Sequence, residues 1–178
     1  MRPALVRAAV AALCAVPLSA CIDSREPILT DARPMLGERL NLQLYTLRDG
    51  HASDPERGRF VWDGQRYRRT RGGMKDVASF TLHPFEGGDA IVQSISVRHP
   101  EHVEYAVMHP LADGVYLVRA IDEEDADAAT RAKLCEKTEK YSCRISTRDQ
   151  LSAFARATAA RKATSGGLAL RLPDAGGK

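Results

Sequence analysis

The sequence of 178 residues lacks the motifs that identify several classes of enzyme. It contains no Gly-x-Ser-x-Gly elbow, no His-Glu-x-x-His pair and no phosphate-binding loop. Its longest apolar stretch, residues 8–18, is too short to cross a hydrocarbon core of ~30 Å. These absences argue against the corresponding hydrolases, against phosphoryl transfer and against a transmembrane helix. We therefore expect no catalytic residue and no cofactor.

The first 21 residues have the organisation of an export signal. Arg2 and Arg7 precede the apolar stretch 8–18, and two small residues follow it directly before Cys21. The tetrapeptide Leu-Ser-Ala-Cys, which ends at Cys21, resembles the lipobox of bacterial lipoproteins. This resemblance covers residues 1–21 only. It implies cleavage before Cys21, a diacylglyceryl group on the Cys21 thiol and acylation of the new N-terminus. Two or more acyl chains attach a protein stably to a membrane. The alternative is an ordinary secretory signal that happens to contain a cysteine.

The chain after the signal bears on the location of the protein and on whether it binds nucleic acid. Removal of residues 1–20, which include two arginines, leaves 158 residues and lowers the formal net charge from +3 to +1. A nearly neutral domain has no general attraction for nucleic acid, and we expect none to bind. Ile22 is not the aspartate associated with inner-membrane retention of such lipoproteins. The resemblance thus implies an outer-membrane anchor at Cys21, facing the periplasm of a Gram-negative bacterium.

Proline positions and cysteine spacing divide the rest of the chain. We expect a lipidated tether over residues 21–37, one globular domain over 38–173 and a disordered tail over 174–178.

Cys14 lies in the signal, so Cys135 and Cys143 remain as an even pair in an exported chain, which predicts a disulfide. Closing that loop stabilises the fold by ~2.5 kcal/mol on the chain-entropy model. Metal ligation is the alternative, but no further Cys or His lies between the two.

The clearest hairpin is centred on the dipeptide Asp63-Gly64. A type I′ two-residue turn at this dipeptide places Phe60 opposite Tyr67, and Arg59 opposite Arg68. Phe60, Trp62 and Tyr67 then share the face toward the core. The other face carries four arginines, namely Arg57, Arg59, Arg66 and Arg68.

This arginine face is the candidate binding site. Like charges directly opposite one another destabilise a strand pair, so the face predicts an anionic partner. Such a partner would be lipid A, an anionic lipid, a cell-wall carboxylate or an acidic protein of the envelope. The alternative is neutralisation by nearby acidic loop residues such as Asp54, Glu56 or Glu86.

Two histidine-proline segments lie 26 residues apart. His83-Pro84-Phe85 and His109-Pro110-Leu111 each precede a glycine-containing turn, and so predict two similar hairpins. Together with His99 and His102 they suggest a metal site. Histidines beside prolines at strand ends are more typical of ordinary loops, and we expect no metal.

The C-terminal third predicts two helices and a returning strand. Residues 126–137 have the charge order of a helix, and Thr147 to Gln150 form a capping box that starts a second one. The alternation over 168–172 predicts a last strand. The segment around Val107 and Met108 is apolar on both faces, so it requires a layer on each side.

The fold class that follows is α+β. We predict an antiparallel β-meander of about six to seven strands with two C-terminal helices packed on it; the alternative is a partly open β-barrel closed by helices. The function we predict is that of a membrane-anchored cell-envelope lipoprotein, a non-enzymatic binding or assembly-accessory module. An inhibitor of secreted hydrolases and an envelope enzyme are the alternatives.

Overall fold

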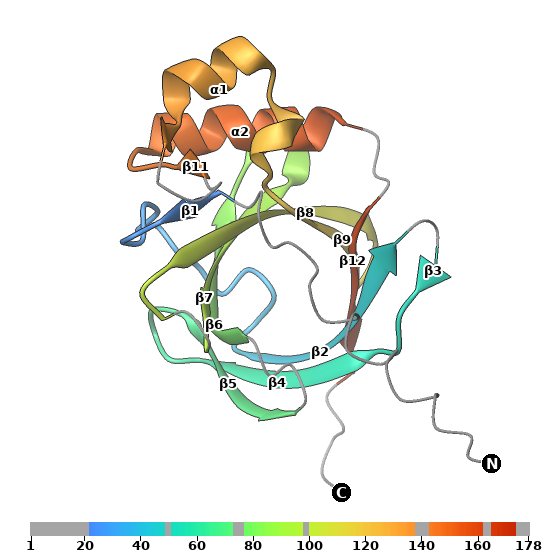
Figure 1. The fold of residues 1–178 in the computed structure, drawn as a ribbon. Coiled ribbons are helices and arrows are strands. Elements are labelled where there is room, and N and C mark those ends of the chain that lie inside the picture. Colours follow the sequence, from blue (N-terminus) through green and yellow to red (C-terminus); the bar gives the residue numbers. More distant parts are fainter. Residues whose placement is uncertain are drawn as a thin grey trace, which may run out of the picture.

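Eight antiparallel strands close into a β-barrel, viewed along its axis in Figure 1. The computed structural model describes residues 22–48, 51–72, 77–97, 100–137, 143–161 and 165–173. The barrel strands are β2 (Arg39–Arg48), β4 (Glu56–Trp62), β5 (Tyr67–Gly72), β6 (Val77–Pro84), β7 (Ala90–Ser96), β8 (Val103–Ala112), β9 (Val115–Ala120) and β12 (Ser165–Leu172). Each strand pairs with the next in chain order, and β12 pairs with both β9 and β2.

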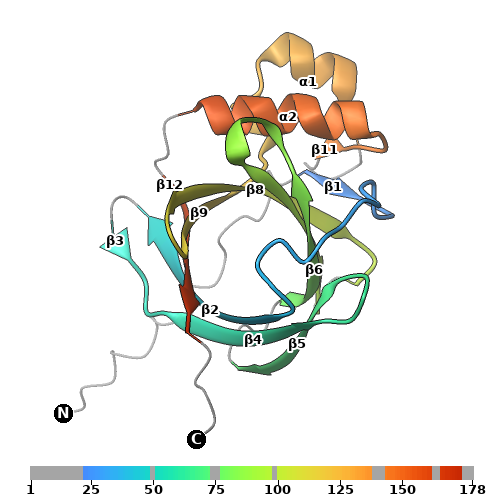
Figure 2. The ribbon, with the colours of Figure 1, turned by 180° about the vertical axis from the view of Figure 1, so that it is seen from behind.

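Pairing of the last strand with the first makes the predicted fold class wrong. β12 and β2 align over eight residue pairs, from Ser165 opposite Arg48 to Leu172 opposite Asn41. The two edges of the expected meander therefore satisfy one another's backbone groups. The partly open barrel closed by helices is also wrong, because strands close the barrel and both helices lie outside it (Figures 1 and 2).

The remaining elements are not part of the barrel wall. They are β1 (Asp23–Ser24), β3 (His51–Ala52), β10 (Glu136–Lys137), β11 (Cys143–Arg144), the 3₁₀ turns η1 (Glu86–Gly88) and η2 (Glu123–Asp125), and the helices α1 (Ala128–Leu134) and α2 (Arg148–Ala160). Helix α1 is shorter than the expected 126–137: the Asp127 side chain caps its start by accepting from the backbone N–H of Thr130, and residues 136–137 form β10 instead. Helix α2 begins at the predicted capping box.

The barrel interior is occupied by aromatic and aliphatic side chains. Phe60 and Tyr67 are 1% and 0% exposed, so the predicted core face of the hairpin is confirmed. Both rings contact Phe80, with centroids 5.0 and 4.9 Å from it. Leu40 and Leu82 complete the centre of this inner core.

A second core, which we call the outer core, lies outside the barrel, between its wall and α2. Val103 and Val107 of β8 point outward and pack in one cluster with Leu151 and Phe154 of the helix. Met108, on the other face of β8, belongs to the inner core. The prediction that this strand is covered on both faces is confirmed. Figures 1 and 2 show α1 and α2 together on this side of the barrel.

The β4–β5 hairpin has a wider loop than the sequence predicted. Trp62 lies opposite Tyr67, so the pairing is displaced by two residues from the expected register and each side chain keeps its face. The Asp63 carboxylate causes this, because its Oδ1 accepts from the backbone N–H groups of Gln65 at 3.0 Å and Arg66 at 2.9 Å. These hydrogen bonds stabilise a four-residue loop in place of the two-residue turn.

The sulfur atoms of Cys135 and Cys143 lie 1.97 Å apart, in agreement with the predicted disulfide. The bond joins the end of α1 to β11. Cys143 is 1% exposed and belongs to the outer core, so the disulfide ties the helical connection to the packed layer under α2.

The outer core can be tested with a matched pair of leucine substitutions. Leu151→Ala removes a side chain that is 0% exposed and should lower the free energy of unfolding by about 2–5 kcal/mol. Leu111→Ala removes one that is 54% exposed and should change it by no more than about 0.5 kcal/mol. Equilibrium denaturation in urea measures both. Equal losses would contradict the packing of α2 on β8.

Candidate functional site

Residues 22–37, expected to be a tether, are part of the folded domain; we call them the N-terminal strap. Ile22 is 0% exposed, and its backbone N–H donates to the carbonyl oxygen of Ile121 at 3.1 Å. Strand β1 pairs antiparallel with β8 and parallel with β11. Leu29 and Leu36 are also buried. These three buried residues lie seven positions apart, so the strap shows neither the period of a strand nor that of an amphipathic helix.

A chain of buried hydrogen bonds holds the middle of the strap against β6 and β7. Leu29 exchanges two hydrogen bonds with the side-chain amide of Gln93, at 3.0 and 3.1 Å. His83 is 1% exposed, with Nδ1 2.9 Å from Asp31 Oδ1 and Nε2 2.8 Å from Thr81 Oγ1. Burial lowers the pKa of His83, although the hydrogen bond to Asp31 acts in the opposite direction. In the neutral ring, Nδ1–H donates to Asp31 and the Thr81 hydroxyl donates to Nε2, a tautomer assigned from these contacts.

The beginning of the strap carries a partly buried charge cluster. Asp23 Oδ2 lies 2.7 Å from His102 Nδ1 and 3.6 Å from Arg144 Nη2. The side chains of Asp23 and Arg144 are 13% and 18% exposed. Because a poorly hydrated carboxylate orients its partners, Asp23 fixes the direction of the Arg144 guanidinium.

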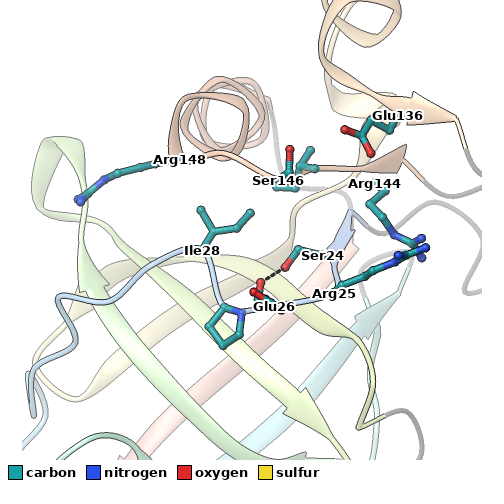
Figure 3. A pocket seen from close by; sticks show the side chains of 10 residues that line it. Ser24, Arg25, Glu26, Ile28, Glu136, Arg144, Ser146 and Arg148 are labelled. Carbon is teal, nitrogen blue, oxygen red and sulfur yellow. Dashed lines mark hydrogen bonds between the residues drawn. The ribbon is translucent and has the colours of Figure 1, made fainter.

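Beside this cluster lies a cleft of about 630 Å³, between the strap and the segment that leads from β11 into α2 (Figure 3). Ile28 and Ile145 contribute its apolar surface. Its charged residues are Arg25, Glu26, Glu136, Arg144 and Arg148. The cleft thus combines three guanidinium groups with two carboxylates.

The arginines of the cleft differ in how they are held. Arg148, at the start of α2, pairs with Asp31 at 3.3 Å, and Arg144 pairs with Asp23. Arg25 is exposed and has no ion-pair or hydrogen-bond partner among the residues that the structure describes. In the view of Figure 3 the side chains of Arg25 and Arg144 extend toward one end of the cleft and that of Arg148 toward the other.

The polar groups of the cleft favour binding over covalent chemistry. Ser24, its most buried hydroxyl, donates to the backbone oxygen of Glu26 at 2.5 Å and lies 2.7 Å from the Tyr105 hydroxyl. No histidine or cysteine is among the described residues that line the cleft. Guanidinium and carboxylate groups around apolar surface can instead hold a charged ligand.

The four arginines predicted as a binding face are only partly available. Arg57 Nε donates to Gln43 Oε1 at 2.9 Å, and Arg68 forms an ion pair with Asp63. Arg68 lies opposite Val61, and a bulge places Arg59 opposite Arg71. Arg66 lies in the loop.

The carboxylate that pairs with this face is Asp63, not Glu86, which was one of those considered for its neutralisation. Hydrogen bonds lower the pKa of Asp63 to about 2; the largest contribution comes from the backbone N–H of Arg66, and the next from the side chain of Arg68. Glu86 instead pairs with Arg156 of α2, 2.8 Å away. An anionic partner for Arg57, Arg59, Arg66 and Arg68 stays a prediction.

The described histidines that could have been metal ligands do not come together. The two that lie in the barrel strands β6 and β8 each contact a separate carboxylate. His83 contacts Asp31, and His109 Nδ1 lies 2.6 Å from Asp89 Oδ1. His99 is outside the described residues. Among the described residues, the group whose ligand atoms are close enough for a metal is Glu123 with Cys135 and Cys143, and these cysteines are joined to each other.

The sequence did not reveal the cleft, because its residues come from distant parts of the chain. Arg25 and Arg144 meet only through the pairing of β1 with β11. The one local signal was the capping box, which positions Arg148 at the start of α2. Cys21 and the predicted tail 174–178 are outside the described residues.

Comparison with known proteins gives no assignment. The chain matches no family model, no curated protein and no solved structure.

The described helices were also considered as membrane spans. None of them is both long enough and apolar enough to cross a membrane.

The buried His83 predicts a loss of stability on acidification. Because its pKa is lowered in the folded state, the unfolded chain takes up the proton more readily. The free energy of unfolding should therefore be highest above the ordinary value of 6.5 and fall as the pH drops through and below it. Thermal or urea unfolding between pH 7.5 and 5.5 measures this fall.

A non-titrating variant isolates the contribution of the ring. His83→Gln should show a smaller fall over the same pH range than the wild type, whereas His51→Gln, at an exposed position, should keep the wild-type fall. The assignment is refuted if His83→Gln and the wild type lose stability in parallel.

Proposed function

We propose that this protein is a lipid-anchored, non-enzymatic binding module of the bacterial cell envelope. The observation that carries the proposal is the charged cleft, which begins only a few residues after Cys21. The lipobox resemblance of residues 1–21 supports the anchor, and the cleft supports the binding role.

The burial of Ile22 determines how such an anchor would act. Acyl chains on Cys21 would enter the bilayer one residue before a side chain that is fixed in the outer core. A domain attached in this way lies against the membrane surface in a restricted orientation, since no flexible linker separates them. The proposed location is the periplasmic face of the outer membrane.

The filled barrel supports a surface ligand rather than an enclosed one. In the interior the ring of Phe80 contacts those of Phe60 and Tyr67, and leucines of β2 and β6 belong to the same cluster. In this proposal the barrel is a rigid scaffold. It positions β8, on which the strap and the cleft are built.

The anchor is tested on the cysteine that would carry it. Wild-type protein produced in a Gram-negative host should incorporate labelled palmitate, and its intact mass should correspond to a chain that begins at Cys21 with added acyl groups. Cys21→Ala should abolish the labelling, because the acylated thiol is absent. Cys14→Ala is the matched control and should be labelled as the wild type is. A mature wild-type chain without added mass would contradict the proposal.

A further inference from the structure

We propose that the end of the cleft formed by Arg25, Arg144 and Glu136 binds a phosphoethanolamine headgroup of the membrane that holds the Cys21 anchor. The inference rests on the proposed function, because it assigns the ligand of the same cleft. In this site the two guanidinium groups hold the phosphate, and the carboxylate receives the primary ammonium group.

Strand pairing brings the two arginines together. β1 and β11 are parallel neighbours with Asp23 beside Arg144. Arg25 directly follows the last residue of β1, so its backbone lies close to Arg144 of the neighbouring strand. Both residues line the same cleft, and in the view of Figure 3 their side chains extend toward the same end of it. Two guanidinium groups in proximity repel one another unless an anion lies between them.

The two arginines are suited to phosphate. Planar guanidinium groups bind phosphate oxygens through pairs of hydrogen bonds. Arg144 is held in place by Asp23, and its buried Nε has no hydrogen-bond partner among the described residues. Arg25 has its charge unpaired within the described part of the chain. The site is thus preorganised on one side and unsatisfied on the other.

Glu136 gives the site its second charge. It lies directly opposite Arg144 in the antiparallel pair of β10 and β11, so their Cβ atoms are about 5 Å apart. Glu136 is exposed and lines the same cleft. A carboxylate and a guanidinium that line one cleft suit a ligand that carries both an ammonium and a phosphate group. A purely anionic headgroup would be repelled by Glu136.

The site lies within reach of headgroups on the anchored surface. Arg25 is the fourth residue after Cys21, so their Cα atoms are at most about 14 Å apart even in a fully extended chain. The headgroup layer on each side of the hydrocarbon core is about 5–7 Å thick. Because Ile22 is fixed in the fold and an arginine side chain is long, Arg25 can enter this layer from the anchored position.

The test is lipid retention by the full-length, lipidated protein. The protein is purified in detergent after reconstitution into vesicles of phosphatidylethanolamine, phosphatidylcholine or phosphatidylglycerol, and native mass spectrometry counts the retained lipid. Phosphatidylethanolamine should be retained at least about tenfold more than either other lipid, because only it supplies both a phosphate and an N–H-bearing ammonium group. Equal retention of the three lipids would overturn the proposal.

Substitutions assign the two halves of the headgroup. Arg25→Glu should lower phosphatidylethanolamine retention at least about tenfold, whereas Arg39→Glu, an identical charge change at an exposed position of β2, should leave it unchanged. Glu136→Gln should keep phospholipid binding and lose the preference for ethanolamine over choline. Unchanged retention in Arg25→Glu would refute the site.

Soluble probes distinguish a headgroup site from a general phosphate site. Free phosphoethanolamine should compete with the retained lipid, and inorganic phosphate at the same concentration should not. Competition by inorganic phosphate alone would contradict the role of Glu136. If Cys21 is acylated and no lipid is selected, this inference fails while the proposed anchor stands; if Cys21 is not acylated, the proposed function fails first.

Discussion

Closure of the barrel by the pairing of β12 with β2 is the constraint on which the remaining architecture depends. It satisfies the backbone groups of the first and last strands at once and fixes the circumference around the aromatic inner core. With the interior filled, the outward apolar residues of β7 and β8 need a separate cover. Helix α2 and the N-terminal strap provide it, so the second core is a consequence of closing the first.

The strap converts this architecture into a site. It begins with the buried Ile22, continues through the ion pair of Asp23 with Arg144, and is held further along by the hydrogen bonds of Gln93 and His83. The same contacts that hold the strap also form one wall of the charged cleft. Anchoring and binding are therefore parts of one structural device in this account. The lipidated residue and the ligand site would be separated by a short and folded stretch of chain.

Local patterns predicted what depends on neighbouring residues. Strand alternation predicted the core face of Phe60 and Tyr67, and apolar residues at successive positions predicted the coverage of β8 on both faces. The spacing of Thr147 and Gln150 predicted the capping box of α2, and an even count predicted the cysteine pair. Closure and the cleft could not be predicted, because they depend on pairs such as Asp23 with Arg144 that no local period reports. The predicted register of the β4–β5 hairpin was wrong, because the hydrogen bonds of the Asp63 side chain outweighed the preference of Asp63-Gly64 for a tight turn.

If Cys21 carries acyl chains, the packed strap should hold the folded domain directly on the membrane. Neutron reflectometry of the lipidated full-length protein on a supported bilayer containing phosphatidylethanolamine measures the separation of protein and headgroups. The account predicts a protein layer in contact with the headgroup layer. An extended strap of sixteen residues would span about 50 Å. A water-filled gap of tens of ångströms between the bilayer and the protein would therefore contradict the account.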